Sequence, residues 1–232
     1  MKKIYIVQVE LPTMINGIVR FITGYKYNHF SLSLDSSLDE LYSFQVRNMN
    51  TFLVGGFMKE REVYYLHGKK DLKLKEFVYE IPVSDEEYKR VSTFVKKVEH
   101  DEEYIFNYIS SLFMFSFGGI KGYKAFHCTE FISEILLLLN DIKLPREPHL
   151  MRPKDLYSIL KNYKYKEKTL SSHELKIPDK DMFFKKIKIM SAIKKICYCV
   201  KESFCRVIFK RKSKNYNFRN VNFYECDVRK GE

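Results

Sequence analysis

The stretch from Ala125 to Leu139 constrains the fold most, because a helix-forming run there follows directly on a Gly-rich segment. Its sequence is AFHCTEFISEILLLL, and from Thr129 onward the side chains are apolar almost all round the helix that the spacing predicts. A helix without a polar face is buried on every side. We therefore expect it at the centre of the molecule, with Cys128 at its start.

A thiol at the start of a helix is a candidate nucleophile. The unpaired amides and the positive dipole end of the helix favour the thiolate of Cys128, and its own N–H is suited to stabilise an oxyanion. The thiol then needs a base, and both His29 and His127 are available. Neighbouring residues of an extended segment usually project to opposite sides, which makes His127 the poorer candidate.

The N-terminal half has the alternation that is typical of strands. Phe30, Leu32 and Leu34 share one side of a predicted strand, so His29 lies on the other, less apolar side. The expected strands are 4–9, 28–34, 40–46, 62–66 and 76–81, and the second and third form an antiparallel hairpin. The expected helices are 17–23, 85–99, 104–117, 129–139 and a short one from 152.

Three segments resemble the circularly permuted, papain-like branch of the NlpC-type hydrolase superfamily, the group of lecithin retinol acyltransferase and the bacterial YiiX-like proteins. They are TGYKYNHFSLSLD (23–35), LDELYSF (38–44) together with GGFMKE (55–60), and FHCTEFI (126–132), and the resemblance spans roughly residues 4–160. It implies an α+β fold in which an antiparallel sheet packs against helices and the nucleophile starts a helix. The active pair would be His29 and Cys128.

The resemblance also implies a third polar residue on the strand after the histidine strand. Ser43 and Gln45 share one face of that strand, and we expect one of them to orient the imidazole. Glu60, from a neighbouring segment, is a second candidate for this role. We expect Tyr27, Phe126 and Glu60 to contact substrate, although core packing is an equal alternative for the aromatic residues.

These features predict a cysteine hydrolase or acyltransferase that acts on an amide, ester or thioester bond of a peptide or lipid acyl substrate through a thioester intermediate. The chemistry requires no metal and no organic cofactor. The alternative is a catalytically weak or inactive module of the same fold that binds a lipid or peptide.

Positive charge is concentrated in the C-terminal part. The net charge of the chain is +12, and 182–214 holds 11 Lys or Arg against one acid, Glu202. We therefore expect a papain-like domain at 1–170, a linker at 171–181 and a basic amphipathic extension at 182–232. Apolar residues recur at helical spacing in the extension, at 189, 193, 196, 200, 204 and 207.

This extension suits an anionic membrane surface, which we expect residues 182–214 to contact. A terminal helix packed on the body with a solvated basic face is a nearly equal alternative, and nucleic acid is not expected because no recognised motif accompanies the charge. The N-terminus has no signal-peptide pattern, and the five cysteines have no disulfide or zinc spacing. We expect a cytoplasmic protein, peripheral at the inner face of the membrane.

Overall fold

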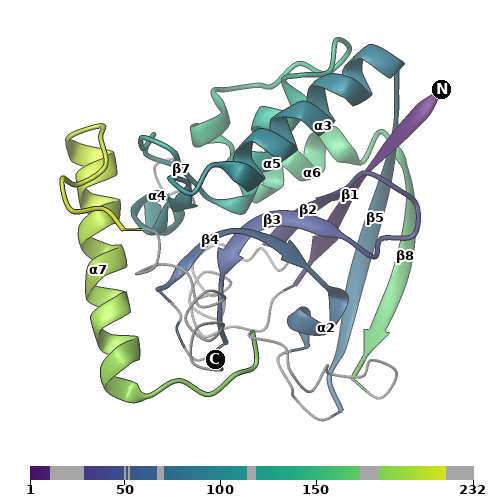
Figure 1. The fold of residues 1–232 in the computed structure, drawn as a ribbon. Coiled ribbons are helices and arrows are strands. Elements are labelled where there is room, and N and C mark those ends of the chain that lie inside the picture. The colour runs from purple at the N-terminus through teal and green to yellow at the C-terminus, as the bar shows by residue number, and fades with distance from the viewer. Residues whose placement is uncertain are drawn as a thin grey trace, which may run out of the picture.

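The computed structural model describes residues 1–10, 29–49, 51, 53–66, 71–113, 119–172 and 183–217. Within them, six strands form one sheet in which every neighbouring pair is antiparallel. The order is β4 (Gly55–Glu60), β3 (Leu41–Val46), β2 (His29–Ser33), β1 (Lys2–Val9), β5 (Lys73–Val83) and β8 (Lys164–Ser171) (Figure 1). The predicted α+β class and the antiparallel pairing of β2 with β3 are confirmed.

Helices and a small second sheet complete the described part. Strands β6 (Ile105–Phe106) and β7 (Ala125–Phe126) pair in parallel. The helices are α2 (Glu62–Tyr65), α3 (Asp85–His100), α4 (Tyr108–Phe113), α5 (Cys128–Leu136), the 3-10 turn η1 (Pro148–Leu150), α6 (Pro153–Leu160) and α7 (Ile189–Ile208). Helices α3, α5 and α6 lie over one face of the large sheet, and α2 lies at the other (Figure 1).

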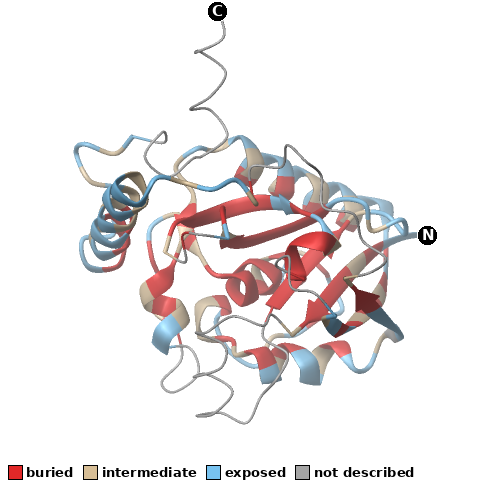
Figure 2. Ribbon diagram, turned by 90° about the horizontal axis from the view of Figure 1, so that it is seen from below, coloured by how far each residue is buried: buried red, intermediate tan, exposed pale blue. Residues whose placement is uncertain are grey.

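Helix α5 occupies the centre, as its composition predicts. Eight of its nine residues are buried, from Cys128 to Leu136, and Figure 2 shows buried ribbon concentrated in the sheet and the helix against it. The ring of Phe131 lies 5.4 Å from that of Phe44 and 5.8 Å from that of Phe57. The main core therefore lies between strands β1 to β5 and helices α3, α5 and α6.

Helix α3 confirms the prediction for 85–99 and shows why it starts where it does. The Ser84 side chain accepts from the Glu87 N–H at 3.2 Å, and the Glu87 carboxylate accepts from the Ser84 N–H at 2.8 Å. This capping box satisfies two amides at the helix start. Val91, Val95 and Val98 then turn toward the core.

Three predicted elements differ from the structure. Residues 62–65 form the single-turn helix α2 instead of a strand. Val63, Tyr64 and Tyr65 are buried in this turn, and their packing outweighs the strand preference of Val and Tyr. Residues 105–106 form β6 instead of starting a helix, and the Asn107 side chain accepts from the Ser110 N–H to start α4 only afterwards. Ser171 ends β8 instead of starting a linker.

Other predictions fall outside the described residues. These are the helix at 17–23, the end of the helix predicted at 104–117 (114–117), residues 173–181 of the linker, and residue 182 and the part from 218 of the extension. The division of the chain at residue 170 stays a prediction. Among the described residues, no helix combines the length and apolar character needed to cross a membrane.

The segment before α7 is bound to the sheet. Phe183 is fully buried and stacks on Tyr64 with 4.4 Å between ring centroids, while its carbonyl accepts from the Met49 N–H at 2.9 Å. The Asn48 side chain donates to the Lys185 carbonyl at 2.9 Å. The beginning of the basic extension is therefore part of the folded body.

Candidate active site

Cys128 and His29 meet where helix α5 reaches the start of strand β2. The helix packs against β2 and β3, and its first residue lies beside the first residue of β2. The side chains of Cys128 and His29 are hydrogen-bonded, and the Phe30 N–H donates to the Cys128 sulfur. Two side chains that are 99 positions apart in the sequence thus form one buried pair.

A carboxylate holds the opposite side of the imidazole. Nε2 of His29 lies 3.0 Å from Oε1 and 2.9 Å from Oε2 of Glu60, the last residue of β4. Because Glu60 occupies Nε2, the other ring nitrogen, Nδ1, is the one left for the thiol. The order Glu60, His29, Cys128 is that of an orienting acid, a base and a nucleophile.

A tyrosine that the sequence analysis did not single out supports this carboxylate. The Tyr65 hydroxyl donates to Oε2 of Glu60 at 2.7 Å and lies 3.0 Å from the Ser31 hydroxyl. Its ring meets the His29 ring edge-on, with 5.6 Å between centroids. Tyr65 is on α2, so the turn that was predicted to be a strand supplies the support. No sequence motif signals this contact.

The charges of the pair stabilise each other. Burial lowers the pKa of His29, but attraction to Glu60 and the hydrogen bonds with Cys128 and Glu60 outweigh it and raise the pKa to about 10. Burial raises the pKa of Cys128, but the hydrogen bond and the charge of His29 lower it below its ordinary value. The site therefore favours an imidazolium beside a thiolate.

His127 has a different task. It is the N-cap of α5, and its Nδ1 accepts from the Glu130 N–H at 3.2 Å. Burial, and then the nearby charge of His149, lower the pKa of His127 to about 3. A neutral ring whose lone pair caps a helix does not serve Cys128 as a base, in agreement with the preference for His29.

The structure separates the other predicted site residues. Ser43 lies at the limit of hydrogen bonding, 3.4 Å from Nε2 of His29, which is the nitrogen that already faces Glu60. Gln45 is buried, and no hydrogen bond joins it to His29 within the described residues. Glu60, expected mainly at the substrate, thus takes the place expected for Gln45 or Ser43.

The two predicted aromatic contacts have different outcomes. Phe126 belongs to β7, is partly buried and packs against the core, with its ring centroid 5.5 Å from that of Phe44 and 5.2 Å from that of Tyr104. Tyr27 lies outside the described residues.

A surface hollow of about 390 Å³ lies beside the β4 edge of the sheet. Glu60 is one of its lining residues, with charged neighbours that include Lys59, Arg61 and Glu99, whereas Cys128 and His29 do not line it. The Glu60 side chain itself is fully buried, so the hollow does not open onto its carboxylate. In the part of the chain that the structure describes, no group of three or more His, Cys, Asp or Glu side chains is arranged to hold a metal ion.

The chain was compared with models of known protein families, with curated proteins and with solved structures. None of the three comparisons found a match. Any function must therefore be argued from the residues and geometry of the chain itself.

Proposed function

We propose that the chain is a cysteine hydrolase or acyltransferase that cleaves an amide, ester or thioester bond. One observation supports this proposal above the others: a helix-start cysteine is hydrogen-bonded to a histidine whose other nitrogen faces a buried carboxylate. A buried charged residue without a function is costly to keep, and here three ionisable groups share one water-poor site. Cys128, His29 and Glu60 are the proposed nucleophile, acid–base and orienting residue.

The proposed reaction has two halves. The Cys128 thiolate attacks the substrate carbonyl, and first-turn amides of α5, which have no partner within the helix, stabilise the oxyanion. Protonated His29 gives its proton to the leaving amine, alcohol or thiol, which departs and leaves a thioester. Neutral His29 then takes a proton from water or another acceptor, which attacks the thioester. Collapse releases the acid or transferred product and restores the thiolate.

We also propose that the fold is the permuted papain-like one. Three features support it: the histidine precedes the cysteine, it lies at the start of a central strand, and the cysteine starts the most buried helix. The third polar residue comes from β4, one strand further along the sheet than the resemblance implied. We propose a peptide or a lipid acyl chain as substrate.

A small activated ester tests the chemistry without knowledge of the substrate. The full chain is mixed with p-nitrophenyl acetate, release of p-nitrophenolate is followed by absorbance, and acetylated peptides are identified by mass spectrometry. We expect a hydroxylamine-sensitive acetyl group on Cys128, formed much more slowly in His29→Gln. Cys197→Ala is the matched control, because Cys197 is an exposed thiol on α7.

The outcome distinguishes an enzyme from a binding module of the same fold. Release that Cys128→Ala abolishes, that His29→Gln slows strongly and that Cys197→Ala leaves unchanged supports the proposal. Equal release by the wild type and Cys128→Ala would contradict it. In that case a binding module with the same fold, the alternative predicted from the sequence, becomes the better explanation.

A further inference from the structure

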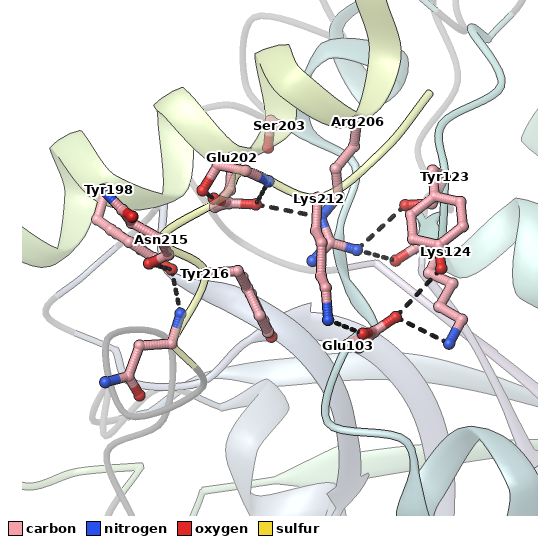
Figure 3. Close-up of polar contacts among 12 residues, drawn as sticks. Glu103, Tyr123, Lys124, Tyr198, Glu202, Ser203, Arg206, Lys212, Asn215 and Tyr216 are labelled. Carbon is pink, nitrogen blue, oxygen red and sulfur yellow. Dashed lines mark hydrogen bonds and ion pairs between the residues drawn. The ribbon is translucent and has the colours of Figure 1, made fainter. Parts of the chain in front are cut away.

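Polar contacts fasten one side of helix α7 to the body. Arg206 is fully buried, and its Nη1 donates to the carbonyls of Tyr123 and Lys124 at 3.1 Å and 3.3 Å (Figure 3). Its Nε lies 3.4 Å from the carboxylate of Glu202, which is also buried, and the Ser203 hydroxyl donates to the Phe106 carbonyl at 3.5 Å. The inner side of α7 therefore combines a buried ion pair and a polar contact with the apolar side chains of Cys199 and Val207.

The outer side of the same helix is apolar. Ile193, Val200, Phe204 and Ile208 recur at helical spacing, with 47 %, 38 %, 52 % and 57 % of their surfaces exposed. Four residues of the stripe predicted from the sequence, at 189, 193, 200 and 204, are exposed, whereas those at 196 and 207 turn toward the body. We call residues 193, 200, 204 and 208 the outer stripe.

This arrangement differs from the usual one. An amphipathic helix on a globular protein normally turns its apolar side to the core and its polar side to water. In α7 the Glu202–Arg206 ion pair faces the body. Separating a buried ion pair costs several kcal/mol, so rotation of the helix about its axis, away from these contacts, is unfavourable. A contiguous exposed apolar stripe of this kind marks a surface that binds something.

The charges beside the outer stripe indicate what it binds. Lys194 and Lys201 are exposed on α7, and the sole acid of the helix, Glu202, is turned inward. The outward surface of α7 is thus apolar and positive, without a negative group of its own. A twofold pairing of two copies would add the same positive charge from both sides to one interface. An anionic lipid surface supplies the missing negative charge.

We propose that the outer stripe inserts into the interfacial region of an anionic membrane, with Lys194 and Lys201 at the lipid headgroups. Each basic residue close to such a surface contributes about 1 kcal/mol, and the apolar side chains add their transfer out of water. Helix α4, which packs against α7, also exposes two apolar side chains, Leu112 and Phe113. The inference does not depend on the catalytic proposal.

Vesicle flotation with the full chain tests the proposal. One set of vesicles is phosphatidylcholine alone, and the other holds phosphatidylcholine and phosphatidylserine in equal parts. We expect the wild type to float with the second set, less so as salt is added. Phe204→Glu should lower the partition constant at least ~10-fold, because it removes an exposed aromatic side chain that would insert into the lipid and adds a negative charge. The double variant Lys194→Glu/Lys201→Glu should lose binding only to the anionic vesicles.

Leu137→Glu is the matched control, because Leu137 is about as exposed as Phe204 but lies at the end of α5. It should float like the wild type. Equal flotation of Phe204→Glu and Leu137→Glu would overturn the proposal. It would also be overturned if the wild type stayed off both vesicle sets and sedimented as a dimer that Phe204→Glu separates, since the outer stripe would then be a self-association surface.

Discussion

Replacing Glu60 by Gln should lower the pKa of His29 from about 10 to roughly 7. Burial already lowers the pKa of this ring, and attraction to Glu60 is the largest effect that opposes it. Two opposite charges about 4 Å apart attract by about 4 kcal/mol at the effective dielectric constant of about 20 that suits protein sites. At about 1.4 kcal/mol for each pKa unit, loss of that attraction corresponds to about three units.

The assay is an NMR titration of protein labelled at histidine Cε1, with the His29 signal assigned from its absence in His29→Gln. Glu60→Gln keeps the size of the side chain and removes its charge. Glu99→Gln is the control, because Glu99 is a carboxylate that pairs with Lys59 and has no contact with the imidazole. A pKa of His29 that stays near 10 in Glu60→Gln would refute the argument that this carboxylate holds the proton on the ring.

Two further changes test other parts of the structure. Glu76 is fully buried, and burial first, then the charge of Glu62, raise its pKa to about 7. The folded state then holds a proton that the unfolded state releases, so stability falls as pH rises from about 4.5 to 7, by about 3 kcal/mol. Urea unfolding should show that Glu76→Gln removes this loss; an unchanged pH profile would contradict the raised pKa. Arg206→Met should lower the free energy of unfolding in urea by about 3–5 kcal/mol, because it leaves the buried Glu202 carboxylate without its cationic partner. The same change at exposed Arg211 should be nearly neutral, and equal losses would contradict the buried pair.

Capping residues and apolar spacing within short segments were enough to predict helices α3 and α5 and strand β2. The capping box at Ser84 and the apolar spacing after it gave helix α3, and the apolar run after Cys128 gave the central helix α5. The alternation in β2 placed His29 on the face opposite Phe30, where the structure has it. Each of these depends on residues within one turn or one strand.

The third site residue depended on contacts between strands. The side chains of Glu60 and His29 meet across β3, which lies between β2 and β4, and no local pattern fixes the two registers that align Tyr42 of β3 with both Leu32 and Lys59. Ser43 and Gln45 were expected because their strand directly follows that of His29 in sequence. Tyr65 was missed because its position depends on a one-turn helix whose Val and Tyr content favours a strand.

Helix α7 shows the same limit for the orientation of a surface. The helical spacing of its apolar residues predicted an apolar stripe. Glu202 and Arg206 are four residues apart, a spacing that is typical of ion pairs on solvent-exposed helix faces. Sequence alone would turn that pair outward. The carbonyls of Tyr123 and Lys124, far away in the sequence, are what draw Arg206 inward.

The hydrogen bonds from Arg206 to those two carbonyls have a consequence for folding during synthesis of the protein. The carbonyls lie four and five residues before Cys128, but Arg206 is synthesised 78 residues after the cysteine. While the ribosome is still adding α7, the loop that leads to Cys128 lacks this anchor. The contacts that hold this loop against α7 therefore form only after the C-terminal helix has been synthesised.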